Sequence, residues 1–159
     1  MSTTGLDVFD RTLQTTNIWL DEIMAELGPD RQVAWHVLGA VLRALRNRLP
    51  VSLSAHLGSQ LPMLIRGVYY DQWQPEHQPN DARSLDQFLQ EVGRGLENIR
   101  PVNSRDAAQV VFHVLSRHID RGQLEKVRDS LTEDVRRLWP ESALADAPSR
   151  GTSDRGQTE

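Results

Sequence analysis

Apolar residues recur along this chain at the spacing of one face of an α-helix, and this periodicity restricts the fold more than any other feature. In the first segment the intervals alternate between four and three, at Phe9, Leu13, Thr16, Leu20, Ile23 and Leu27. Such intervals place the residues on a single stripe of a helix. Similar spacing continues through most of residues 31–138. The sequence therefore predicts an all-α fold, a helical bundle with this stripe facing the core.

Prolines and glycines divide the first half of the chain into three predicted helices. The first helix ends at Gly28, which can adopt the left-handed conformation of a helix end. The second helix ends at Pro50, and Gly39 inside it predicts a close helix crossing. Pro62 lies within the third helix. Because proline removes a donor and clashes with the preceding turn, we expect a kink or a restart there.

A segment rich in proline and polar residues, 71–83, separates this half from three further predicted helices in residues 84–140. Ser84 and Gln87 form a capping box that starts the fourth helix. Ser52 and Ser104 are expected to cap helices as well. Residues 141–159 hold almost no large apolar side chain, so we expect a disordered tail.

The two halves can be overlaid, which predicts an internal duplication. Shifts of 72, 73 and 70 residues match the first, second and third helices to the fourth, fifth and sixth. Arg66 and Arg136 match, and each precedes an aromatic residue by three positions, Tyr69 and Trp139. We therefore expect two similar antiparallel three-helix units, residues 1–70 and 84–140, that pack as one domain through pseudo-twofold symmetry.

The matched arginines are expected to be structural, because a structural device is copied with a repeat whereas a ligand site is usually single. Each guanidinium group should be partly buried and should pair with a carboxylate or a helix-end carbonyl, with its stem covering apolar surface.

The most specific stretch of the sequence is LPMLIRGVYYDQW at 61–73, with a shorter echo, LTEDVRRLWP, at 131–140. Through these stretches the chain resembles the bacterial domain-of-unknown-function family 2267, from about Phe9 to Pro140. The family commonly has glycine where this chain has Gln72, and proline where it has Thr132. The second departure predicts that the sixth helix is straight where the third is kinked. The resemblance implies the fold and no activity.

Composition excludes several function classes. The chain has no cysteine, which excludes disulfides, thiolate catalysis and cysteine metal sites. Its longest apolar runs are far shorter than the roughly 20 residues that span a bilayer, and residues 1–7 do not resemble a secretory signal. We expect a cytoplasmic protein with no membrane contact. The net charge of −4 makes nucleic acid an unlikely partner.

Charge is distributed unevenly along the chain. Residues 1–30 carry six acids and one arginine, whereas residues 31–70 carry five arginines and no acid. One interpretation is that acids of the first helix pair with the basic rims of its neighbours, and in particular neutralise Arg43, Arg46 and Arg48. The alternative is an anion-binding face. We favour the pairing, because it needs no ligand.

No pattern of catalytic or metal-ligating residues emerges. The five histidines lack metal-ligand spacing, and His113 and His118 are expected to diverge on one helix. No nucleophile elbow or phosphate-binding loop is present. We therefore expect no metal, no cofactor and no enzymatic activity.

The best candidate for a binding site is the cluster Arg66, Tyr69, Tyr70 and Trp73. Aromatic side chains with polar tips beside an arginine are typical of ligand pockets and interface hot spots. Alternatively these residues close one end of the core, which Trp139 at the matched position favours.

These observations favour a non-catalytic interaction or adaptor protein, whose partner is another protein or a second copy. A stress-related role is a further hypothesis. The alternative is a small-molecule or anion-binding protein that uses the cluster around Arg66.

Overall fold

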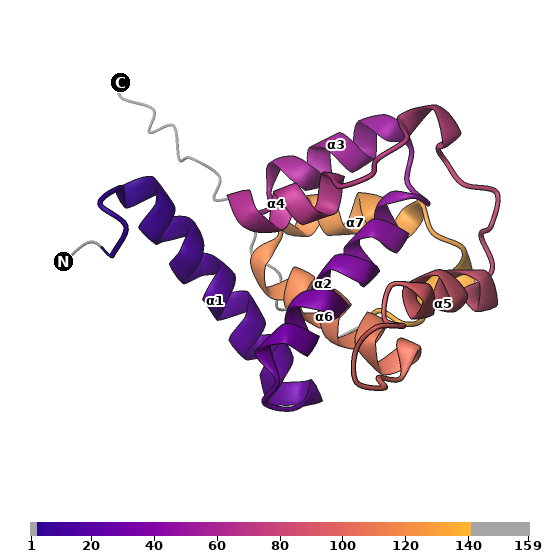
Figure 1. The fold of residues 1–159 in the computed structure, drawn as a ribbon. Coiled ribbons are helices and arrows are strands. Elements are labelled where there is room, and N and C mark those ends of the chain that lie inside the picture. Colours follow the sequence, from indigo (N-terminus) through magenta and orange to yellow (C-terminus); the bar gives the residue numbers. More distant parts are fainter. Residues whose placement is uncertain (1–2, 141–159) are drawn as a thin grey trace, which may run out of the picture.

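The chain folds into helices without strands throughout residues 3–140, the part that the computed structural model describes (Figure 1). The elements are α1 (Asp7–Leu27), α2 (Arg31–Arg46), α3 (Val51–Ser59), α4 (Met63–Tyr70), the 3-10 turn η1 (Pro75–His77), α5 (Leu85–Arg94), α6 (Ser104–His118), α7 (Arg121–Asp129) and α8 (Glu133–Arg136). The predicted all-α fold is confirmed. The expected disorder of residues 141–159 lies outside the described residues. None of the helices in residues 3–140 is long and apolar enough to cross a membrane.

The two halves share one core. Helix α2 packs against α1, α4, α5 and α6, and α6 packs against α1 and α5 in turn. The first helix of each half thus contacts the central helix of the other, since α1 touches α6 and α5 touches α2. Figure 1 shows α2 and α6 crossing in the middle of the molecule, with α3 beside α7. A single cluster of buried side chains contains residues from both halves.

Two glycines permit these close crossings. A Cβ atom on Gly39 would lie 2.7 Å from Cγ1 of Val68 in α4, as the predicted crossing requires. A Cβ atom on Gly95, just after α5, would lie 2.7 Å from Cβ of Ala40 in α2. Any side chain at either position would separate α2 from its neighbour.

The predicted third helix is interrupted at Pro62, as expected, so α3 and α4 are separate helices. The prediction of a straight sixth helix is wrong, because α7 ends at Asp129 and α8 begins at Glu133. Thr132 has φ −65° and ψ 157°, the same conformation as Pro62 with φ −58° and ψ 152°. Its hydroxyl lies 3.0 Å from the carbonyl oxygen of Arg83 and 2.5 Å from Oδ1 of Asp134. These side-chain contacts hold the extended conformation that proline imposes covalently.

Each half therefore contains four helices rather than three. Helices α3 and α7 have nine residues each and begin at 51 and 121, a shift of 70. The contacts also correspond, since α1 packs on α4 as α5 packs on α8. These matches are consistent with the predicted duplication.

Capping residues were predicted with mixed success. The capping box of Ser84 and Gln87 at the start of α5 is confirmed. Ser52 and Ser104 are not caps, because Pro50 and Asn103 occupy the N-cap positions of α3 and α6. Both serines lie in the first turn, one or two residues past the cap.

The apolar stripe of α1 is only half buried. Thr16, Leu20 and Ile23 lie in the core, whereas Phe9 is 49% exposed and Leu13 is 42% exposed. The expectation that the whole stripe faces the core is wrong for these two residues. The corresponding helix α5 begins at Leu85, the residue matched to Leu13, so it lacks a counterpart of the first six residues of α1, nearly two turns. Figure 1 shows the start of α1 at the outer edge of the molecule.

Candidate functional site

Arg66 closes the gap between α3 and α4. Its Nε donates to the carbonyl oxygen of Gly58 at 2.9 Å, and its Nη2 donates to those of Ser59 and Leu61 at 3.1 and 2.9 Å. These carbonyls belong to the end of α3, which has no further turn to satisfy them. The predicted pairing of a partly buried Arg66 with helix-end carbonyls is confirmed.

Arg136 performs the same task for α7. Its Nε donates to the carbonyl oxygen of Arg128 at 3.1 Å and its Nη2 to that of Leu131 at 3.1 Å. The acceptors lie eight and five residues before the arginine, as Gly58 and Leu61 do for Arg66. The predicted symmetry of this pairing is confirmed as well.

Tyr69 is fully buried and belongs to the core. Its hydroxyl donates to the carbonyl oxygen of Ser54 at 2.8 Å. Burial raises the pKa of Tyr69, whereas the hydrogen bond to Ser54 opposes that shift. At the matched position Trp139 is also buried, and its Nε1 donates to Oγ of Ser116 at 2.6 Å. Each half thus places an aromatic residue with one satisfied polar atom in its core.

Tyr70 and Trp73 extend this aromatic group toward the surface. The ring of Tyr70 lies 5.0 Å from that of Tyr69 and 5.1 Å from that of Trp73. The Tyr70 hydroxyl lies over Gly58, and Nε1 of Trp73 donates to Oε1 of Gln78. The structure therefore brings the four predicted site residues together, but their polar atoms contact other parts of the chain. This geometry favours the interpretation that they close the core.

The segment 71–83 is packed on the bundle. The side-chain amide of Gln78 donates to the carbonyl oxygens of Arg46 and Leu49 and to Oγ of Ser54. Gln72 has φ 57°, in the left-handed region that favours glycine. The glycine common at this position in the resembled family suits that conformation.

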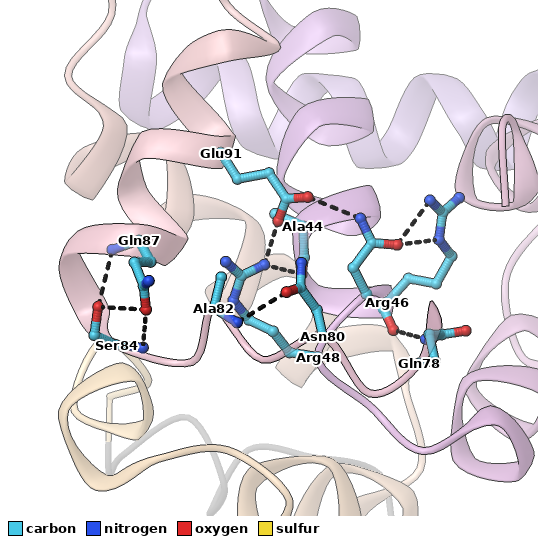
Figure 2. A network of polar contacts seen from close by, with 10 residues as sticks. Ala44, Arg46, Arg48, Gln78, Asn80, Ala82, Ser84, Gln87 and Glu91 are labelled. Atoms are coloured by element: carbon cyan, nitrogen blue, oxygen red, sulfur yellow. Dashed lines mark hydrogen bonds and ion pairs between the residues drawn. The ribbon is translucent and has the colours of Figure 1, made fainter. Parts of the chain in front are cut away.

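Arg46 and Arg48 are buried, which the sequence did not predict. Arg46 is 3% exposed, and its Nη1 donates to the carbonyl oxygens of Tyr69 and Asp71 at 2.7 and 2.8 Å. Its Nε and Nη2 lie 3.1 and 2.9 Å from Oδ1 of Asn47 (Figure 2). Arg46 thus ties the end of α4 to α2.

Arg48 links the two halves. It is 2% exposed, forms an ion pair with Glu91 of α5, and donates to the carbonyl oxygen of Ala44 at 2.9 Å. Its guanidinium carbon lies 5.0 Å from the ring centre of Phe88. Figure 2 shows Glu91 reaching Arg48. The side-chain amide of Asn47 also donates to Oε1 of Glu91, at 2.8 Å. The expectation that acids of the first helix neutralise Arg46 and Arg48 is wrong. Arg46 donates to backbone carbonyls and to Asn47. Arg48 contacts Glu91 and the carbonyl oxygen of Ala44.

The acids of α1 pair mainly with α6. Glu22 lies 2.8 Å from Nε2 of His118, and Glu26 lies 3.1 Å from Nδ1 of His113. Asp21 of α1 pairs with Arg31, the first residue of α2, at 3.3 Å. Within residues 3–140 no group of three or more His, Cys, Asp or Glu side chains could hold a metal ion.

Six exposed apolar side chains at the start of α1 and on α4 lie outside the core. Leu6, Val8, Phe9 and Leu13 at the start of α1, with Met63 and Leu64 of α4, are all more than 40% exposed; we call these six residues the apolar overhang. The backbone N–H of Leu64 donates to Oγ1 of Thr12 at 3.3 Å, which holds the two helices side by side. A hollow of about 340 Å³ lies between Val8, Thr12 and Met63.

The sequence carried a signal for this surface. Met63 and Leu64 match Glu133 and Asp134 at the shift of 70. When matched positions are acidic in one half and apolar in the other, the side chains at these positions are expected to have different surroundings in the two halves. Overlaying the two halves reveals the residues that they share, so it did not predict this difference at Met63 and Leu64.

A family model described as "Uncharacterized conserved protein (DUF2267)" matches residues 16–138. The chain belongs to this family. The resemblance predicted from residues 61–73 is thereby confirmed. No curated protein matches the chain. The DUF2267 match contains both helix breaks and both arginines, whereas the part of the apolar overhang on α1 precedes it.

Proposed function

We propose that this protein is a non-catalytic interaction protein and that the apolar overhang is its binding surface. The observation that carries the proposal is the exposure of Phe9 and Leu13 on the same stripe that enters the core two turns later. Contiguous exposed apolar side chains are typical of interaction sites.

A second copy of the chain is the occupant that this surface favours. Leu6, Phe9 and Leu13 are spaced by three and then four residues, as in the seam of a coiled coil. A helix with the same spacing is the complementary partner for such a seam, and a second copy supplies one. Two identical surfaces can pair about a twofold axis, so that each covers the other.

The alternative, a small-molecule or anion site made by Arg66, Tyr69, Tyr70 and Trp73, has less support. Arg66 donates to the carbonyls of α3, and Tyr69 is fully buried. A ligand at this place would have to displace the bonds that hold α3 and α4 together. The cytoplasm is the expected compartment, in line with a sequence free of cysteine. The stress-related role stays a prediction.

Sedimentation equilibrium of the full chain over a range of concentrations tests the proposal. We expect the wild type to form a dimer in the micromolar range. Leu13→Ser should weaken dimerisation at least tenfold, about 1.4 kcal/mol of association energy. Ile18→Ser is the matched control, because Ile18 is 45% exposed on the same helix. It lies about 180° around the helix from Phe9.

Ile18→Ser should leave dimerisation unchanged. A wild-type chain that stays monomeric at millimolar concentration would contradict the second copy as occupant. Equal weakening by Leu13→Ser and Ile18→Ser would contradict the placement of the surface.

A further inference from the structure

A polar hollow opens where α2 ends. It has a volume of about 290 Å³ and is lined by Arg43, Arg46, Asn47, Gln72, Gln74 and Glu91, among others. Four of these, Arg46, Asn47, Gln72 and Gln74, also line an adjoining hollow of about 550 Å³ over the segment 71–83. The two hollows therefore meet at a wall of guanidinium and carboxamide groups.

Arg43 brings a positive charge to this place. Its side chain is half-buried, and within residues 3–140 it has no hydrogen bond or ion pair. One of its Nη atoms lies 3.0 Å from where a Cβ of Gly39 would be, so the guanidinium lies along α2. It faces the hollow of 290 Å³ on one side and a further hollow, lined also by Trp35, Leu64 and Asp71, on the other.

Arg46 adds a second positive charge with a free donor. Four of its five N–H groups are used by Tyr69, Asp71 and Asn47, which leaves one on Nη2. Burial lowers the pKa of Arg46, and the charge of Arg43 acts in the same direction, whereas Tyr69, Glu91 and Asp71 oppose the shift. Arg43 and Arg46 line the same hollow of 290 Å³, so an anion bound there would be attracted by both charges.

The acid in the wall of this hollow is already compensated. Glu91 accepts from Arg48 through Oε2 and from the side-chain amide of Asn47 through Oε1. Within the hollow of 290 Å³, Arg43 and Arg46 therefore face a single acid that already has partners, although the chain as a whole carries a net charge of −4.

We propose that this hollow binds the phosphate group of a small phosphomonoester, with Arg43 as its main anchor and Arg46, Gln72 and Gln74 as further donors. Arginine recognises tetrahedral oxyanions through paired N–H donors, and carboxamides complete the set of donors. The hollow of about 290 Å³ accommodates the phosphate. The polar hollow of about 550 Å³ beside it, whose lining includes Glu76 and Asp81, accommodates the uncharged, hydroxyl-bearing rest of a small ester.

Calorimetric titration of the full chain with inorganic phosphate and with glycerol phosphate, against chloride at equal ionic strength, tests this inference. We expect millimolar binding of phosphate, tighter binding of the ester, and no response to chloride. Arg43→Gln should weaken both at least tenfold. Arg31→Gln is the matched control, because Arg31 is an exposed arginine of the same helix that pairs with Asp21. It should bind as the wild type does.

Amide chemical shifts of the wild type provide a second measurement that needs no variant. Phosphate should shift resonances in residues 40–47 and 72–78. Shifts confined to other parts of the chain, or equal losses in Arg43→Gln and Arg31→Gln, would overturn the proposal. Because dimerisation through the apolar overhang involves none of these residues, its failure and the failure of this inference are distinguishable.

Discussion

The helix breaks before α4 and before α8 use the same arginine device, yet the residues that follow them differ in chemistry. After the first break come Met63 and Leu64, both exposed, beside an α1 that continues for two more turns. After the second come Glu133 and Asp134. Oδ2 of Asp134 accepts from the backbone N–H of Leu85, the first residue of α5. A polar side chain thus closes the corner in the second half, whereas the first half leaves an apolar corner open.

This difference separates what the fold requires from what it permits. Both halves need Arg66 or Arg136, because each break leaves carbonyls at a helix end without partners. The bundle does not need Met63 or Leu64, since acids occupy the same positions in the other half. Exposed apolar residues at a position where the fold accepts acids support the proposal of an intermolecular contact.

The largest effect is expected at Arg48, because this arginine is buried whereas its match in the second half, Arg121, is exposed. Arg48→Met should lower the free energy of unfolding by about 3 kcal/mol, because it leaves Glu91 without its ionic partner. Arg121, its match in the sequence, pairs with Glu125 at 3.6 Å with 47% of its side chain exposed. Arg121→Met should cost under about 0.5 kcal/mol. Urea titration of both variants measures the contrast, and equal costs would show that Arg48 is not a tie between the halves.

The matched arginines should give a smaller and equal effect. Arg66→Met and Arg136→Met each keep the apolar stem and remove the donors to the helix-end carbonyls. Each should cost roughly 1 to 3 kcal/mol. Denaturant titrations of the two variants should agree within about 0.5 kcal/mol. A neutral Arg66→Met beside a costly Arg136→Met would break the comparison and make Arg66 a candidate ligand group again.

The smallest effect is expected in the pH dependence of stability. Tyr69 can ionise, whereas Trp139 at the matched position cannot. Burial raises the pKa of Tyr69 above its ordinary value of 10.0, so the folded state favours the neutral hydroxyl. This contribution is fully present below pH 10 and is lost as the pH rises toward the folded pKa. The loss is at most about 1.4 kcal/mol per pH unit.

Unfolding of Tyr69→Phe between pH 9 and 11 checks this expectation. The variant should lose less stability over this range than the wild type, and the control Tyr70→Phe should behave as the wild type does. An identical pH dependence in all three proteins would show that Tyr69 ionises freely in the folded state.

The sequence predicted what local geometry decides. Pro62 and the capping box at Ser84 act within a few residues, and the pairing of Arg66 and Arg136 follows from two matched positions. The break at Thr132 was missed, because a threonine can take the conformation of Pro62 only with contacts to Arg83 and Asp134. Local propensity does not contain those contacts.

The candidate surfaces depend on distant parts of the chain and were harder to predict. Phe9 and Leu13 lie on the same stripe as the buried Leu20 and Ile23, and only the tertiary packing of α1 decides which part of the stripe is covered. The burial of Arg48 depends on Glu91, which is 43 residues away. The cluster of arginines in residues 31–70 was visible in the sequence, but which of them lacked a partner was not.

The most direct test of the apolar overhang transfers the corner of the second half to the first. Met63→Glu combined with Leu64→Asp places the residues of Glu133 and Asp134 at the matched positions. Sedimentation equilibrium, with the melting temperature as a check on folding, compares this variant with the wild type. The account predicts a folded monomer at concentrations where the wild type is a dimer. A variant that dimerises as tightly as the wild type would contradict it.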